Sequence, residues 1–75
     1  MTKTTKLYNL LKLGKRASVV YRCINDDDKL YGYAYWDGER LESEDGGYYS
    51  IEDDVQNYSW DDDNTLIVWI NVAWR

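Results

Sequence analysis

Histidine and paired cysteines are missing from this 75-residue sequence, and their absence removes several kinds of chemistry. Without histidine the chain lacks the usual general base at neutral pH and the commonest metal ligand. The single cysteine, Cys23, can form no disulfide within the chain, and its apolar neighbours indicate a small buried side chain. A chain without disulfides suits a reducing compartment, so we predict a cytoplasmic protein.

Long apolar runs are also missing. No run is long enough to cross a bilayer, and Lys12 interrupts the apolar stretch 7–13 with no small-residue cleavage site after it, so we expect neither a membrane span nor a signal peptide. The length allows one domain, residues 1–75, with a modest core. Four tryptophans and eight tyrosines strengthen that core, because aromatic side chains bury a large area per residue.

Charge is divided unevenly along the chain. Residues 1–24 hold six basic residues and no acid, whereas residues 25–75 hold fourteen acids and three basic residues, so the two parts carry +6 and −11. The acids gather in three runs, at 26–28, 52–54 and 61–63. Polarised surfaces steer charged partners, and the acidic excess disfavours direct binding to nucleic acid or to an anionic membrane.

The first segment has helical spacing, and the remainder has strand character. Leu7, Leu10 and Leu11 stand at i, i+3 and i+4, which predicts a short helix over 4–13 that ends at Gly14. Beyond it, β-branched and aromatic runs alternate with turn residues. We therefore predict an α+β fold, in which a short N-terminal helix packs on a small antiparallel sheet of four or five strands. The predicted strands are 17–24, 29–36, 39–43, 48–51 and 65–74, with a helical turn at 52–58.

Turns at Asp37-Gly38 and at 25–28 divide the predicted sheet into two faces. The first face is apolar and should meet the leucines of the helix; it carries Val19, Tyr21, Cys23, Leu30, Ala34, Trp36 and Leu41. The second face is amphipathic and carries Val20, Arg22, Tyr31, Tyr33, Tyr35, Arg40 and Glu42. Arginine beside tyrosine on an exposed sheet favours stacking of bases, sugars or peptide side chains, although the same pairs also stabilise a sheet with no ligand.

Three interpretations compete for the acidic runs. Solvated turns favour Asp and Asn, and net negative charge keeps an aromatic-rich protein soluble. A dedicated calcium loop is not predicted, because the required Gly and Glu are absent from positions six and twelve counted from Asp26 or from Asp61. The third interpretation is an anionic face that docks on a basic protein groove. Its partner-binding residues are Asp26, Asp27, Asp28, Asp53, Asp54, Asp61, Asp62 and Asp63.

Motifs for catalysis are missing as well. No serine stands in a nucleophile-elbow context, and Gly46-Gly47 is a turn signal and not a phosphate-binding loop. Paired carboxylates can hydrolyse glycosides across a cleft, but these acids stand in polar turns and the chain has little room for a cleft. We predict no enzymatic activity, no cofactor and no bound metal.

In length, charge and aspartate runs the chain resembles the small acidic inhibitors that phages direct against nucleic-acid-binding host proteins. The resemblance implies an inhibitor that mimics nucleic acid, and it transfers no residue. Our prediction is a non-enzymatic module that binds a protein with a basic surface. One alternative is a direct binder of single-stranded nucleic acid or a glycan; its residues are Arg22, Tyr31, Tyr33, Tyr35 and Arg40. A second alternative is a self-associating structural component, since the basic N-terminal segment can dock on the acidic turns of another copy.

Overall fold

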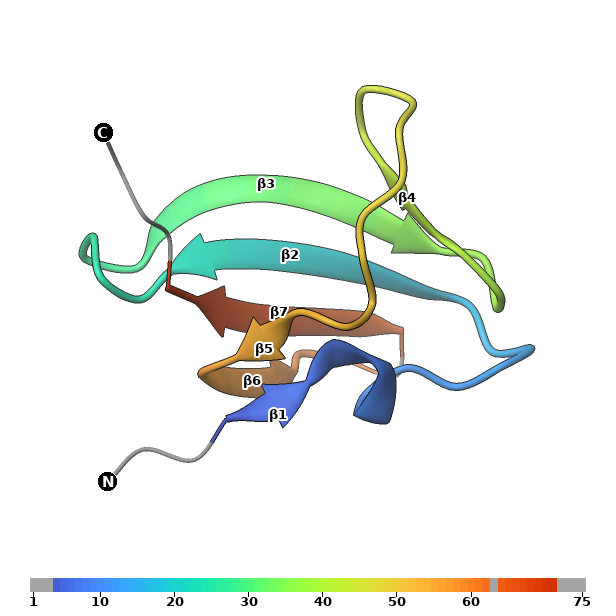
Figure 1. The fold of residues 1–75 in the computed structure, drawn as a ribbon, viewed down its shortest axis with the longest axis horizontal. Helices are drawn as coiled ribbons and strands as arrows, with labels where there is room; N and C mark the ends of the chain where they lie inside the picture. The colour runs from blue at the N-terminus through green and yellow to red at the C-terminus, as the bar shows by residue number, and fades with distance from the viewer. Residues whose placement is uncertain (1–3, 63, 72–75) are drawn as a thin grey trace.

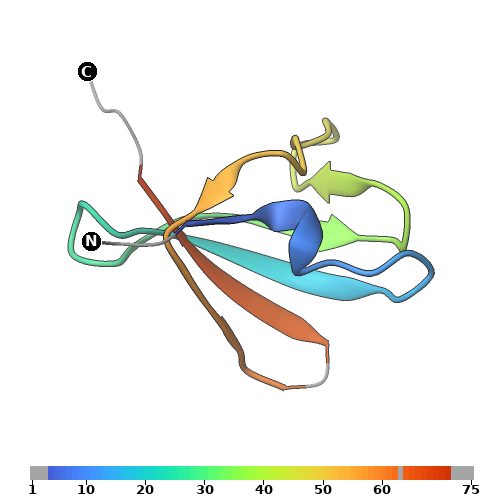
Figure 2. The ribbon, with the colours of Figure 1, turned by 60° about the horizontal axis from the view of Figure 1, so that its bottom comes forward.

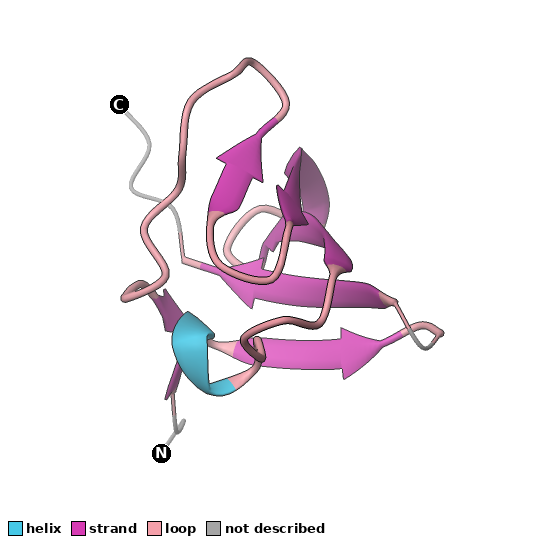
Figure 3. Ribbon diagram, turned by 90° about the vertical axis from the view of Figure 1, so that its right-hand side faces the viewer, coloured by secondary structure: helices cyan, strands magenta, loops and turns pink. Residues whose placement is uncertain are grey.

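The computed structural model describes residues 4–62 and 64–71. Strands make up nearly all of its regular structure, and no helix of seven or more residues occurs in the described part. Figure 3 shows the single helical turn, in cyan, among the strands. The elements in chain order are β1 (Thr5–Lys6), the 3-10 turn η1 (Leu7–Asn9), β2 (Ala17–Cys23), β3 (Lys29–Trp36), β4 (Leu41–Ser43), β5 (Asp54–Val55), β6 (Asn57–Trp60) and β7 (Thr65–Ile70).

Five strands form the main sheet, in the order β4-β3-β2-β7-β6 (Figure 1). The two central strands, β2 and β7, run parallel, and every other neighbouring pair is antiparallel. Parallel strands need a long connection, and here the chain between them builds β3, β4, β5 and β6. Because β2 and β7 run in the same direction, the turn before β7 lies at the opposite end of the sheet from the turn after β2.

A second, two-stranded sheet of β1 and β5 lies over one face of the main sheet (Figure 2). The pairing continues past β1, because the Leu7 N–H donates to the Asp53 carbonyl at 3.0 Å and the Tyr8 N–H donates to the Ile51 carbonyl at 2.8 Å. We call the segments 4–13 and 49–56 the covering layer. One face of the main sheet is thus covered, and its other face is left open.

The core lies between the covering layer and one face of the main sheet. Leu7 and Val55 of the covering layer are almost completely buried, as are Val19, Leu66 and Val68 of the central strands. The side chains of this cluster are Leu7, Leu11, Ala17, Val19, Tyr21, Ala34, Trp36, Leu41, Val55, Leu66 and Val68. Cys23 is also buried, as the sequence indicates. The central strand β7 alternates between buried and half-buried side chains because only one of its faces is covered.

The prediction of an N-terminal helix packed on a sheet, and with it the α+β class, was wrong. The three leucines do reach the core, with Leu7 and Leu11 buried and Leu10 packed against it, but through an extended segment and one 3-10 turn. A helix of ten residues is marginal without docking. The backbone of this segment pairs instead with 51–55, which satisfies N–H groups that a short helix would leave without partners.

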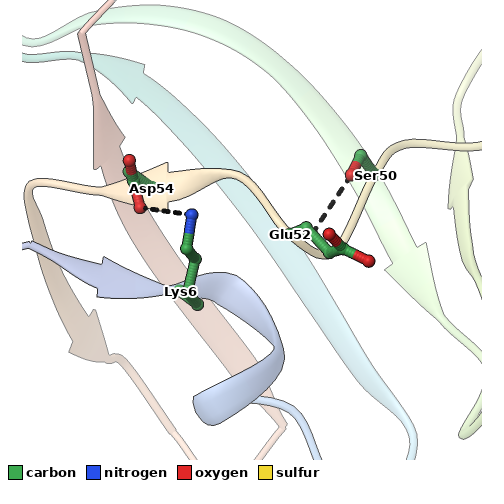
Figure 4. Close-up of polar contacts among 4 residues, drawn as sticks. All are labelled: Lys6, Ser50, Glu52 and Asp54. Carbon is green, nitrogen blue, oxygen red and sulfur yellow. Dashed lines mark hydrogen bonds and ion pairs between the residues drawn. The ribbon is translucent and has the colours of Figure 1, made fainter.

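Two further expectations needed correction. The helical turn predicted at 52–58 is absent; the Ser50 hydroxyl accepts a hydrogen bond from the Glu52 N–H at 3.1 Å and closes a tight turn that leads into β5 (Figure 4). The strand predicted at 48–51 is reduced to one bridge, between Tyr48 and Glu42. The strand predicted at 29–36 is confirmed, and 17–24 and 65–74 are confirmed as far as Cys23 and Ile70, with 72–74 outside the described residues.

Candidate functional site

The acidic runs at 26–28 and 61–62 lie at opposite ends of the main sheet. The first run forms the turn after β2, and the second forms the turn before β7, which starts beside the start of β2. Along the seven residues of β2 this separation is roughly 20 Å. Asp27 and Asp28 adopt left-handed backbone angles, which Asp tolerates better than most residues, so their turn has a local structural reason for aspartate. Asp63 lies outside the described residues.

The third run belongs to the covering layer. Asp54 is the first residue of β5, and its carboxylate forms an ion pair with the Lys6 ammonium at 3.0 Å (Figure 4). Asp54 raises the pKa of Lys6 through this hydrogen-bonded pair. The Asp53 carbonyl accepts the Leu7 N–H, so its backbone holds the β1 segment. The structure therefore does not join the seven described members of the predicted partner-binding aspartates into one row, and Asp54 already has a cation beside it.

A denser acidic region surrounds the short edge strand β4. Between positions 37 and 45 the chain carries five acids and one base, Arg40, so this hairpin and its loops hold a net charge of −4. We call this region the acidic edge; its carboxylates are Asp37, Glu39, Glu42, Glu44 and Asp45. Sequence reasoning missed it because the acids alternate with other residues and form no run. The signal was present in the predicted hairpin, which places all five acids in one short stretch of chain.

Hydrogen bonds hold several carboxylates of the acidic edge in place. Backbone N–H groups of Arg40 and Glu39 donate to Asp37 and lower the pKa of its carboxyl group. The Ser43 hydroxyl and the Gly47 N–H donate to Asp45 and lower the pKa of that group as well. Glu44 accepts the Tyr33 N–H at 3.0 Å, which fastens the loop after β4 to β3. The negative charge is thus tied to a fixed backbone.

The uncovered face of the main sheet, which we call the open face, carries aromatic and aliphatic side chains interspersed with polar ones in three cross-strand rows. Tyr33, Val20 and Ile67 occupy the middle row and continue to Ser59. The outer rows are Glu42-Tyr35-Ser18-Thr65 and Leu30-Arg22-Trp69-Asn57. None of these side chains is buried, and Tyr33 and Tyr35 are 49% and 41% exposed. Arg22 and Glu42 are the charged side chains of the three rows, so the face has little charge on a strongly acidic chain.

The structure changes two members of the predicted tyrosine face. A β-bulge opposite Tyr21 and Arg22 leaves Tyr31 between their partners, Gly32 and Leu30. The ring of Tyr31 therefore does not share the face of Tyr33 and Tyr35, and it lies 6.4 Å from the ring of buried Tyr21. Leu30, assigned to the core face by the sequence, joins the open face beside Arg22.

Arg40 also leaves the tyrosine face. The β3–β4 connection has four residues, 37–40, instead of two, so Tyr35 pairs with Glu42 and not with Arg40. Its guanidinium lies 5.6 Å from the ring centre of Tyr48, within cation–π range. Arg22 remains on the face, and its guanidinium donates to the Asp28 carbonyl at 3.0 Å. Sequence reasoning missed Ile67 and Trp69, because their place on this face depends on the parallel pairing with β2.

No metal centre emerges from the residues that the structure describes: no three His, Cys, Asp or Glu side chains gather to hold an ion. Nor does any described helix have the length and apolar character that a membrane crossing requires. No protein-family model matches the sequence, and no curated protein or solved structure matches it at a significant level.

Proposed function

We propose that this chain is a small protein-binding module whose recognition surface is the open face of the main sheet. The observation that carries the proposal is a set of exposed or half-buried aromatic and aliphatic side chains among polar ones, on a sheet whose other face already holds the core; these side chains are Val20, Leu30, Tyr33, Tyr35, Ile67 and Trp69. Folding uses the covered face. The open face contributes little further burial in the isolated chain, so its apolar character is explained by a partner that covers it.

The composition of the open face supports a protein partner. Protein interfaces are depleted of charged residues and enriched in Tyr, Trp and Arg. Tyr33, Tyr35 and Trp69 are the aromatic anchors, and Arg22 lies between Leu30 and Trp69. Binding residues of this type on a rigid sheet need little reorganisation, which lowers the entropic cost of association.

The charge of the partner follows from the acidic edge. Glu42 belongs both to the acidic edge and to an outer row of the open face, so a partner on the face meets this charge along the β4 side. The complementary partner is a protein with an apolar patch bordered by lysine or arginine. The aspartate runs at the two ends of the sheet add to the steering of such a partner, and the β4 side makes the direct contacts.

A second copy of the chain fits this surface less well. Two open faces packed with their β4 edges on the same side place two acidic edges of net −4 opposite each other. Like charges at an interface raise the free energy of the complex. The proposal is therefore a hetero-complex, and it is a proposal of binding and not of catalysis.

Columns that carry matched variants test the proposal. The wild type, a face variant with Tyr33→Ser and Tyr35→Ser, and a control variant with Tyr8→Ser and Leu13→Ser are immobilised separately. Tyr8 and Leu13 are 47% and 82% exposed and lie outside the open face, so the control removes similar apolar area. A nuclease-treated cell lysate is applied, and any protein that a salt gradient elutes is purified and its affinity is measured by calorimetry.

We expect one protein with a basic surface to bind the wild type and the control alike. The face variant should bind it at least tenfold more weakly, because buried aromatic anchors dominate interface energies. Affinity should also fall as salt rises. Equal affinity of the face variant and the wild type contradicts the proposal, and so does saturable binding of a single-stranded oligonucleotide that the same two substitutions abolish.

A further inference from the structure

A groove of about 480 Å³ opens on the covered side of the molecule, away from the open face. Its apolar walls come from Leu10 of the covering layer, Trp36 at the end of β3, and Tyr58 and Trp60 of the edge strand β6. This volume falls in the range of small-molecule sites, which combine mostly apolar walls with a few convergent polar groups.

The groove exists because the covering layer is narrower than the sheet. Tyr58 and Trp60 pair in register with Val68 and Leu66, whose side chains are fully buried, so all four point to the covered side. Tyr58 and Trp60 nevertheless remain 46% and 43% exposed. The rings of Tyr58 and Trp60, at alternate positions of β6, thus continue the core surface and form one exposed wall of the groove.

Hydrogen bonds fix the basic side of the groove. The Trp36 indole N–H donates to the Lys12 carbonyl at 2.8 Å, and the Lys15 N–H donates to the same carbonyl at 3.2 Å. The Gly14 N–H donates to the Gly38 carbonyl at 2.8 Å and ties this loop to the β3–β4 turn. The backbone that carries Lys12 and Lys15 is therefore positioned beside the aromatic wall before any ligand arrives.

The charged residues that line the groove sum to +1, although the chain as a whole carries −5. Lys12 and Lys15 line it together with one acid, Asp62, and an adjoining hollow shares Lys15 and adds Arg16. Across the part of the chain that the structure describes, the one ion pair is Lys6–Asp54, so neither lysine of the groove has a carboxylate partner there. The Asp62 carboxylate accepts a hydrogen bond from the Asn64 N–H at 2.8 Å, and this bond holds the carboxylate against its own turn.

We propose that this groove binds a nucleoside monophosphate. The base lies against Trp60 and Tyr58, since every base has a flat face that stacks on aromatic rings. The phosphate lies between Lys12 and Lys15, because lysine ammonium groups bind phosphate as point charges. The Asn9 side chain, which also lines the groove, offers a donor and an acceptor to the base edge. A longer nucleic acid is disfavoured by the acidic remainder of the chain.

Titration of the ¹⁵N-labelled full chain with adenosine 5′-monophosphate, followed by nuclear magnetic resonance, tests the proposal. We expect saturable shifts at the Trp60 indole N–H and at residues 9–15, and none at Ile67 or Trp69 of the open face. Adenosine and inorganic phosphate, titrated separately, should each bind at least tenfold more weakly, because each lacks one half of the recognised chemistry. Indole-3-acetate, an aromatic carboxylate, should also bind more weakly than the nucleotide.

Four variants complete the test. Lys12→Gln and Lys15→Gln should each raise the dissociation constant for the nucleotide about tenfold, the size expected for one charge-assisted hydrogen bond. Trp60→Leu should raise it by a similar factor. Lys29→Gln removes the same charge from an exposed site on β3 and should leave it unchanged. Unchanged affinity in both groove lysine variants, tighter binding of adenosine or indole-3-acetate than of the nucleotide, or no saturable shift overturns the proposal.

Discussion

At the scale of single residues, Tyr21 has an unusual environment. Its side chain is 2% exposed, and its hydroxyl has no hydrogen-bond partner among the described residues. The rings of Tyr49 and Tyr31 lie 5.0 and 6.4 Å from its own. Burial raises the pKa of the Tyr21 phenol, with smaller contributions from Tyr49, Asp53 and Tyr31. The ring therefore stabilises the core while the hydroxyl costs free energy.

Tyr21→Phe should stabilise the protein for this reason. Removal of a buried hydroxyl without a partner relieves a desolvation cost, and we expect a gain of about 1 kcal/mol in the free energy of unfolding. Urea denaturation measures it, with Tyr33→Phe as a control that removes a half-exposed hydroxyl. A loss of stability in Tyr21→Phe alone would show that the Tyr21 hydroxyl has a partner in the folded chain.

Gly38 is required by a close backbone approach. Its φ is 103°, and a Cβ atom at this position would lie 3.1 Å from the Gly14 Cα. Gly46 has a similar φ of 96° but open space around it. Gly38→Ala should therefore lower the free energy of unfolding by more than the ~1–2 kcal/mol that a left-handed alanine costs at Gly46. Thermal unfolding of both variants measures the difference, and equal losses would contradict a tight Gly14–Gly38 contact.

At the scale of elements, the sequence predicted most of the strands, but the N-terminal helix that it predicted is absent. Alternating side chains, bounded by turn residues, correctly predicted β2 and β3, because a half-buried strand imposes a period of two residues on its sequence. The predicted β3–β4 loop was two residues too short. Because strand faces repeat every two residues, Leu41 nevertheless faces the core, as predicted. The leucines of 7–11 have the spacing of a helix, but backbone pairing with β5 decides the conformation. That pairing joins segments over forty residues apart, and local spacing carries no information about it.

The candidate site was predictable only in part for a similar reason. The tyrosine alternation in β3 correctly placed Tyr33 and Tyr35 on one exposed face. The bulge at Tyr31 breaks the alternation, and Gly32, a glycine inside the strand, is the residue type that could have signalled it. Ile67 and Trp69 enter the face through a parallel pairing that long-range topology determines. The acidic edge and the groove likewise depend on how segments are brought together.

The β3–β4 turn gives the protein an acid-sensitive element. Hydrogen bonds from Arg40 and Glu39 lower the pKa of Asp37, so the folded state favours its ionised form more than the unfolded state does. A lowered pKa contributes stability above the unfolded value, and that contribution is lost as pH falls through the folded value. Stability should thus decline below about pH 5. The same sign applies to Asp45 and Asp62, whose pKa values are also lowered.

Asp37→Asn tests this origin of acid sensitivity. The variant should be less stable than the wild type at neutral pH, and its stability should fall less steeply between pH 5 and the acid limit. Chemical denaturation at a series of pH values measures both effects. Asp26→Asn removes the same charge from another turn and serves as the control. Parallel pH profiles for Asp37→Asn and the wild type would exclude the turn as a source of acid sensitivity.

At the scale of the whole molecule, one face of the sheet holds the core and the other remains open beside an acidic edge. This arrangement should keep the isolated chain monomeric, because each copy brings an acidic edge of net −4 to an association through the open face. Glu39→Gln, Glu42→Gln and Glu44→Gln in one chain should promote dimers. Asp26→Asn, Asp27→Asn and Asp28→Asn remove three charges from the end of the sheet and should not. Sedimentation equilibrium at low salt measures both, and a wild-type dimer would contradict the role given to the acidic edge.

The central claim is tested most directly by methyl nuclear magnetic resonance of the chain. Spectra are recorded with and without the protein that the wild-type column retains. Val20 and Ile67 report on the open face, and Leu10 and Leu13 report on the covered side. We predict that binding shifts the methyl signals of Val20 and Ile67 and leaves those of Leu10 and Leu13 in place. Shifts at Leu10 and Leu13 with none at Val20 and Ile67 would contradict the open face as the recognition surface.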